Sequence, residues 1–172
     1  MMLQKLMKEL NKVDTIRIAG SKLYFDKREI DLAQSIPSLA NNKDLPGKYK
    51  SEQFMPSFPE WLVYSFDEYN GIFFYTKNEI IEKLAIALMV PNNDGCFSGE
   101  IIVNGQIIPN PLYATDAKNF FPRLELHKAP STYKDDFTPH YSNQYLLDEK
   151  LELEIVTNRD GKYIGVINIK PC

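Results

Sequence analysis

Hydrophobic and polar residues alternate along much of the chain, which is the pattern of strands that bury one face in a core. The longest run covers residues 80–90, where only Glu82 interrupts an apolar face. That face consists of Ile80, Leu84, Ile86, Leu88 and Val90. Residue types alone favour a helix here, but a helix would point Ile86 and Val90 outward beside charged residues. We therefore predict a central strand.

A hairpin is predicted just before this strand, with Trp61 to Phe66 and Ile72 to Thr76 as its arms. Asn70-Gly71 supplies residues that tolerate the positive φ of a tight turn. Because its apolar residues need cover, the whole stretch 66–90 is expected to form the middle of a sheet.

Three further segments show the same alternation. Residues 15–32 predict a three-stranded meander, residues 97–108 a hairpin with Asn104-Gly105 at its tip, and residues 151–170 a hairpin around a turn at 159–161. Residues 21–32 and 99–112 share a pattern of strand, two-residue turn and strand. We expect these two hairpins to occupy related positions in the sheet.

Two segments predict helices, and one predicts a long connection. Residues 2–12 have apolar residues at helical spacing, and Thr115 can cap a short helix that runs to Phe121. Residues 33–59 contain four prolines and a glycine, so only a short helical turn at 33–39 is expected there. Long connections often bind something, which makes the 41–59 loop a candidate specificity loop.

Together these patterns predict an α+β fold that is mainly antiparallel sheet. We expect one domain over residues 1–172, with an N-terminal helix at 1–13 and a β-rich body at 14–172. The N-terminal helix and the short helix at 115–121 would pack on the sheet. A membrane-surface helix at the N-terminus would need more cationic charge and bulky aromatic residues.

Composition narrows the possible functions. The net charge is −3 and no basic stripe occurs, which disfavours nucleic acid as a partner. Two cysteines, Cys96 and Cys172, are too few for a disulfide framework and fit a reducing compartment. The sequence has no signal-peptide pattern and no run of about 20 apolar residues. We therefore predict a cytoplasmic protein that does not bind membranes.

Catalytic and metal-binding motifs are missing from the sequence. It contains neither glycine-rich phosphate motif and no zinc-type spacing of cysteine and histidine. A nucleophile pairing of Cys96 with His127 or His140 has no supporting motif, and acid pairs such as Asp67-Glu68 are typical of solvated turns. We predict a protein that is not an enzyme, with no cofactor and no metal.

Aromatic residues are abundant, with ten tyrosines and ten phenylalanines. Those of the central hairpin are expected to fill both faces of a covered sheet, namely Trp61, Tyr64, Phe73, Phe74 and Tyr75. A second group lies among acidic residues in an irregular region, and tyrosine beside acid can grip a basic protein surface. We take Tyr133, Asp135, Asp136 and Tyr141 as candidate partner contacts. Alternatively, these tyrosines simply lie over the sheet edge.

The segments SKLYFDKREI, FDEYNGIFFY and PNNDGCFSGEIIVNG together resemble a poorly characterised bacterial domain family. The resemblance runs from about Lys22 to Gly105. Its members are small cytoplasmic proteins found beside interbacterial toxins, as suspected immunity proteins. This chain has Phe66 where a Trp is usual and Tyr69-Asn70 where Leu is expected. The family pattern describes a fold, so it implies no site residues.

The resemblance implies an immunity-type protein that binds a cognate, basic, cytoplasm-acting toxin and blocks it by surface occlusion. Such a protein would be a monomer or a weak homodimer. One alternative is a structural module, such as an adaptor of a secretion system or a phage particle, that self-associates through a sheet edge. Another is a small enzyme that uses His127 or His140 with a carboxylate.

Overall fold

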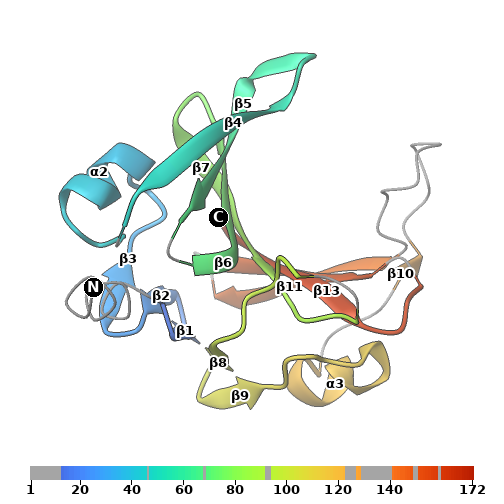
Figure 1. The fold of residues 1–172 in the computed structure, drawn as a ribbon. Coiled ribbons are helices and arrows are strands. Elements are labelled where there is room, and N and C mark those ends of the chain that lie inside the picture. Colours follow the sequence, from blue (N-terminus) through green and yellow to red (C-terminus); the bar gives the residue numbers. More distant parts are fainter. Residues whose placement is uncertain are drawn as a thin grey trace, which may run out of the picture.

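Two β-sheets pack around one apolar core in this computed structural model (Figure 1). For Tyr69, residues 127–128 and residues 141–148 only the backbone is described. The structure describes residues 13–45, 47–67, 69–91, 94–122, 127–128, 141–148, 151–158 and 160–172. Within these residues the chain is mostly antiparallel strand, as predicted, with short helices. The helix predicted for residues 2–12 lies outside them.

The smaller sheet has five strands in the order β3-β2-β1-β8-β9. They are β1 (Thr15–Ala19), β2 (Lys22–Phe25), β3 (Arg28–Ile30), β8 (Glu100–Val103) and β9 (Gln106–Ile108). The predicted meander and the predicted hairpin at 97–108 are both confirmed. The sequence pattern did not predict that β1 and β8 pair in parallel.

The two similar hairpins stand on either side of β1, at related positions as expected. Their turn residues Asp26 and Asn104 both have positive φ, a conformation that short polar residues tolerate. Asp26 Oδ1 accepts hydrogen bonds from the amides of Asp14 (3.1 Å) and Thr15 (2.9 Å). Asn104 Oδ1 accepts one from the amide of Gly20 at 2.9 Å. The two turns thus hold the opposite ends of β1.

The larger sheet is antiparallel throughout, in the order β10-β11-β12-β13-β7-β6-β5-β4. Its strands are β4 (Tyr49–Met55), β5 (Phe58–Phe66), β6 (Tyr69–Lys77), β7 (Ile80–Ala87), β10 (His127–Lys128), β11 (Tyr141–Asp148), β12 (Leu151–Thr157) and β13 (Ile164–Pro171). The predicted hairpin at 151–170 is β12 and β13. β7 lies between β6 and β13, which confirms the predicted central strand.

The predicted turn at Asn70-Gly71 is wrong. Phe66 pairs with Tyr69, so the β5–β6 hairpin closes before Asn70 is reached. Gly71 instead lies inside β6 with φ +76°, where the backbone of Cys96 and Phe97 crosses it. A glycine is needed there for close backbone approach, which sequence alone does not separate from a turn.

A bulge in β7 explains why Glu82 interrupted the apolar pattern. The register shifts where Thr76 pairs with Ile81 and Tyr75 with Lys83, so Glu82 is the extra residue of the bulge. Ile81 is therefore buried at 1% exposure, whereas Ile80, predicted to face the core, is 64% exposed. Beyond the bulge the prediction holds, because Leu84, Ile86 and Leu88 are buried.

Residues 33–59 are more regular than predicted. The short helix α2 (Ile36–Asn41) is capped by the Ser35 side chain, which accepts from the Ser38 amide. β4 then forms where an irregular loop was expected. All seven residues of β4 are exposed, so no apolar alternation marks it, and the strand is held by its pairing with β5.

The predicted helix at 115–121 is present as a 3₁₀ turn, η1 (Ala114–Asp116), followed by α3 (Ala117–Phe120). Thr115 does not cap it, since it lies within the 3₁₀ turn and no side-chain cap is formed. Ala117 and Phe121 are buried, which fixes this segment on the core.

Aromatic rings connect the two sheets across the core. Phe25 of β2 lies 6.2 Å from Phe74 of β6, measured between ring centroids, and Phe74 lies 5.7 Å from Phe66 of β5. All three side chains are buried. Tilted and edge-on ring pairs of this kind are favourable beyond the area they bury.

We predict that Gly71→Ala lowers the free energy of unfolding by about 3 kcal/mol or more. The new Cβ would lie 2.0 Å from the Phe97 amide nitrogen, which only a backbone shift could relieve. Gly105→Ala is the matched control, because Gly105 also has positive φ but no atom within 4 Å of the Cβ position. It should cost about 1 kcal/mol. Urea denaturation measures both, and equal losses would contradict the close-approach explanation.

Candidate functional site

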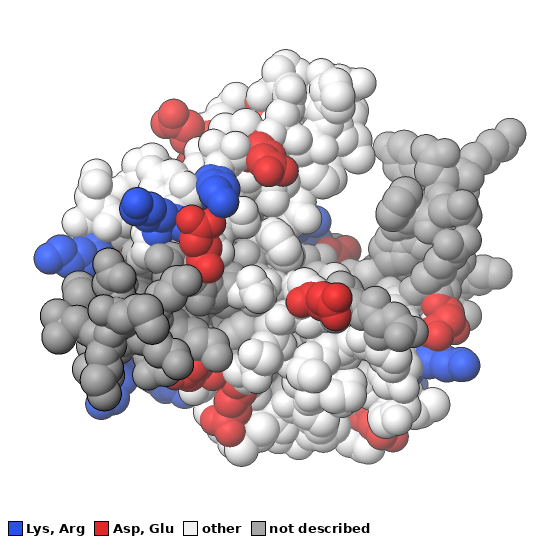
Figure 2. All heavy atoms as spheres, in the orientation of Figure 1, with Lys and Arg blue, Asp and Glu red and all other residues white. Residues whose placement is uncertain are grey.

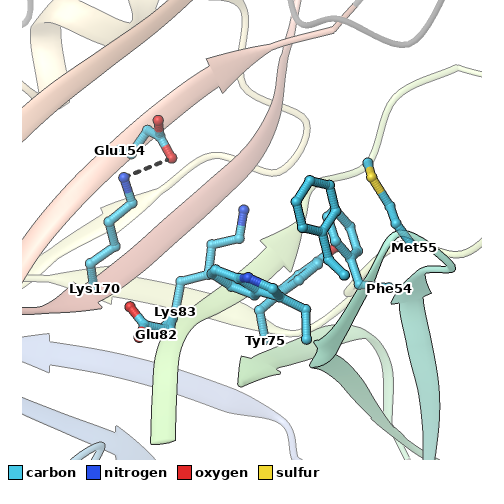
Figure 3. Close-up of a pocket in the computed structure, with 9 residues that line it drawn as sticks. Phe54, Met55, Tyr75, Glu82, Lys83, Glu154 and Lys170 are labelled. Carbon is cyan, nitrogen blue, oxygen red and sulfur yellow. Dashed lines mark ion pairs between the residues drawn. The ribbon is translucent and has the colours of Figure 1, made fainter. Parts of the chain in front are cut away.

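A groove of about 530 Å³ lies on the face of the larger sheet that points away from the core. We call it the outer groove. It is lined by Phe54, Met55, Phe58, Trp61, Tyr75, Glu82, Lys83, Glu154 and Lys170. These residues come from β4 to β7 and from β12 and β13, so the groove crosses most of the sheet. Figure 3 shows an aromatic side and a charged side.

The aromatic side is built on the β4–β5 hairpin and β6. The Phe54 ring lies 5.4 Å from Tyr75, edge-on at 81°, and 6.4 Å from Trp61. Phe54, Met55 and Phe58 are each more than 40% exposed. Large apolar side chains gathered in one exposed place are typical of binding surfaces.

The aromatic residues of the central hairpin were expected to be covered on both faces of the sheet, and this is correct for one face only. Tyr64 and Phe74 are buried in the core, but Trp61, Phe73 and Tyr75 on the other face are only partly buried. The reason lies in the strand period, because alternate residues point to opposite faces and the smaller sheet covers just one of them. Among the described residues, the outer face is left open as the groove.

An ion-pair network forms the charged side. Lys170 Nζ lies 3.3 Å from Glu154 Oε2 (Figure 3). It also lies 3.7 Å from Glu152 Oε1. Asn168 Nδ2 donates to Glu154 Oε2 at 2.8 Å. These side chains are largely buried, so the pairs are less screened by solvent than surface pairs. Lys170 is therefore compensated by two carboxylates.

Lys83 differs from Lys170 because it forms no ion pair with any carboxylate in the described part of the chain. Its ammonium lies 4.5 Å from the centre of the Tyr75 ring. Burial lowers the pKa of Lys83 below 10.5, partly offset by the charge of Glu154. Figure 3 shows this ammonium between the Glu154–Lys170 pair and the aromatic side chains.

The sequence-predicted contacts are only partly described. Tyr133, Asp135 and Asp136 lie outside the described residues, and Tyr141 is described only by its backbone, which pairs with Lys128 at the start of β11. The predicted specificity region 41–59 does contribute to the outer groove, through Phe54, Met55 and Phe58. It does so as a hairpin and not as a loop.

Sequence reasoning missed the outer groove, although part of its signal was present. Alternation with period two places Lys83 on the face of β7 opposite the apolar one. The same alternation places Trp61 on the outer face of β5. What could not be read was that β4 lies beside β5 and adds Phe54 to this face. That neighbour relation arises from strand pairing.

The other candidate chemistries find no site in the described structure. No group of three or more metal-ligating side chains comes together within the described ranges. His127 lies in β10 with only its backbone described, and His140 lies outside the described residues. Cys96 and Cys172 are not joined in a disulfide. Asp67 pairs with Lys50 at 2.9 Å on the surface.

Surface charge is mixed. Acidic and basic side chains are interspersed on the face drawn in Figure 2. Within the described part of the chain, no helix is long and apolar enough to cross a membrane.

Comparison with known proteins gives no assignment: no protein family model, no curated protein and no solved structure matches the chain. What the chain can bind therefore follows from the chemistry of the outer groove and the exposed edge of β4.

We predict that Lys83→Met raises the free energy of unfolding by up to about 1 kcal/mol, because it removes a partly desolvated charge that has no counterion. Lys170→Met, the matched control, should lower it by about 1–2 kcal/mol, since Glu152 and Glu154 would lose their cation. Chemical denaturation of both variants measures the two changes. If Lys83→Met lowered the free energy of unfolding as much as Lys170→Met does, the Lys83 charge would have to be fully compensated in the folded protein.

The gain from Lys83→Met should shrink at alkaline pH. The folded-state pKa lies below 10.5, so the ammonium form weakens the folded state at neutral pH, and this effect fades as pH rises through the folded pKa toward 10.5. Tyr75 on β6, Lys170 on β13 and Glu154 on β12 face Lys83 in both proteins. Comparing the variant with the wild type at each pH therefore cancels much of their own titration.

Proposed function

We propose that this protein is a non-enzymatic, immunity-type inhibitor that binds a cognate toxin acting in the cytoplasm and blocks it by covering its surface. The observation that carries the proposal is the outer groove, in which Phe54, Trp61 and Tyr75 form an exposed aromatic wall beside fixed charges. Interfaces concentrate their binding energy in tryptophan and tyrosine side chains set in such partly buried pockets.

The β4–β5 hairpin suits a docking role. It extends beyond the rest of the sheet in Figure 1, and its exposed Phe54, Met55 and Phe58 lie near the tip. A partner could contact these residues and the groove floor together. The hairpin is held by strand pairing with one register shift, between Gln53 and Met55, and this pairing limits the ordering entropy lost on binding.

Charge supports a basic partner. The net charge of −3 would favour encounter with a positively charged protein, since long-range complementarity mainly raises the association rate. Tyr133, Asp135, Asp136 and Tyr141 stay predicted contacts for such a partner.

A binding role is favoured over catalysis by the residue types of the groove. Its nine lining residues include no serine, threonine, cysteine or histidine, so the described lining lacks the usual nucleophiles and the commonest general base. Of its lysines, Lys170 is held in a structural ion-pair network.

We predict that the tagged protein co-purifies with one stoichiometric partner from its native cell, and that this partner is toxic when expressed alone. Phe54→Ala and Trp61→Ala should each weaken the complex at least about tenfold, because both truncate the aromatic wall. Ile107→Ala, at an exposed apolar residue of β9, should leave affinity unchanged. Isothermal calorimetry with the purified partner measures this, and equal affinities for all three variants would reject the groove as the interface.

A second candidate function is self-association through a sheet edge, as in a structural or adaptor module. The observation that favours it is β4, which among the described strands pairs with β5 alone and is exposed along all seven residues. Such an edge presents unpaired backbone groups that a second strand can join.

If β4 pairs with another copy, the molar mass measured by light scattering should rise from monomer to dimer with concentration. Gln53 lies at an exposed position of this strand. Gln53→Pro should weaken the dimer, because proline has no backbone N–H to donate and distorts the strand locally. A constant monomer mass up to millimolar concentration would rule out this candidate.

A further inference from the structure

The outer groove contains one lysine that has no ion-pair partner among the described residues. Lys170 has two carboxylate partners, whereas Lys83 has none in the described structure, although it is partly buried. A desolvated ammonium weakens a fold unless an anion accompanies it. Lys83 would be better compensated by a negative group supplied from outside.

The neighbouring carboxylates do not fill this role. Glu154 is engaged by both Lys170 Nζ and Asn168 Nδ2, at 3.3 and 2.8 Å. Glu82 points away from the Lys83 ammonium in Figure 3 and is exposed. No carboxylate of the described residues occupies the space in front of Lys83, so a carboxylate that another molecule brings could pair with its ammonium.

The aromatic wall lies within reach of the same ligand. Tyr75 stands between the two features, with the Lys83 ammonium 4.5 Å and the Phe54 ring 5.4 Å from its ring centre. In an extended peptide, side chains two residues apart point to one face and are separated by about 7 Å. A carboxylate and a large apolar side chain at that spacing match Lys83 and the wall.

We propose that the outer groove binds an extended segment of a protein partner, in which an acidic side chain contacts Lys83 and an apolar side chain two residues away packs against Phe54, Trp61 and Tyr75. This names the part of the partner that the outer groove takes, and in that sense it rests on the function proposed above. A partner that is basic overall can carry such a segment, because total charge steers encounter and local pairs set specificity.

A basic segment fits the groove less well. Both large rings already have a cation of this chain near their faces, with Lys83 Nζ 4.5 Å from the centre of Tyr75 and Lys77 Nζ 5.8 Å from that of Trp61. A lysine or arginine brought to the wall would meet these charges. We take the acidic segment as the occupant and the basic one as an outcome that the test can reveal.

Trp61 makes the test direct, because it is the only tryptophan of the chain and it lines the groove. Its fluorescence can be followed during titration with three peptides, acetyl-Ala-Phe-Ala-Glu-Ala-amide and its Gln and Lys counterparts. We expect saturable binding of the Glu peptide, with the Gln peptide at least about tenfold weaker and the Lys peptide weaker still. Calorimetry on the same samples detects binding that leaves the fluorescence unchanged.

Three variants assign the preference to Lys83. Lys83→Met should bind the Glu and Gln peptides equally, and Lys83→Arg should keep the preference for Glu. Lys77→Met removes a charge over the Trp61 ring without changing the groove lining, so it should keep the preference for the Glu peptide over the Gln peptide. Because Lys83→Met is expected to be at least as stable as wild type, lost discrimination would not reflect unfolding.

The proposal is overturned by equal binding of the Glu and Gln peptides to the wild type, by stronger binding of the Lys peptide, by a preference that survives in Lys83→Met, or by no binding of any peptide. Its failure can be told apart from failure of the inhibitor function. A toxic partner that binds wild type and Lys83→Met equally would keep the inhibitor function and reject this segment. If the protein prefers the Glu peptide but no toxic partner is found, the proposed segment would be kept and the inhibitor function rejected.

Discussion

The rest of the structure depends on the packing of one face of the larger sheet against the smaller sheet. The rings of Phe25, Phe66 and Phe74 make this contact, with the aliphatic residues of β7, β12 and β13 around them. Burying this face is the main source of stability that the described structure offers. It also decides where the outer groove lies, because alternate residues of the same strands must point to the opposite face, where the smaller sheet cannot cover them.

Two local departures from ideal strand geometry allow the larger sheet to bury one face in the core and form the outer groove on the other. The bulge at Glu82 brings Ile81 into the core and places Lys83 beside Tyr75 on the outer face. Gly71, with its positive φ, lets the backbone at Phe97 cross β6 closely enough to complete the core. Without the bulge, the residues of β7 before it would face the other way, since a shift of one residue exchanges the two faces of a strand. The outer groove is thus a consequence of how the core is closed.

The groove combines features that stability alone would not select. Two features weaken an isolated protein: the exposed aromatic residues at the β4–β5 hairpin, and the partly buried Lys83, which has no carboxylate partner among the described residues. Residues that lower stability yet shape one surface are common where a protein binds something. In the network beside them Lys170 lies within ion-pair distance of two carboxylates, whereas Lys83 has no such partner among the described residues. This contrast within one groove is why we take it as a recognition site.

By itself the sequence determined the mainly antiparallel sheet and the hairpins formed by strands adjacent in sequence, because alternation at residues such as Leu84, Ile86 and Ile155 reports which face is buried, and Asn104-Gly105 dictates its turn. It did not predict pairs between distant segments, such as β1 with β8 or β7 with β13. It did not reveal β4, whose residues are exposed on both faces, or the role of Gly71, whose turn-like signature serves a close approach. The outer groove was decided only by tertiary structure. Phe54, Trp61, Tyr75 and Lys83 come from four successive strands, whereas Glu154 and Lys170 come from much later in the chain. Hydrogen bonding between neighbouring strands brings them all to one face. Periodicity within a strand is a local property, whereas the choice of neighbouring strand depends on the whole chain.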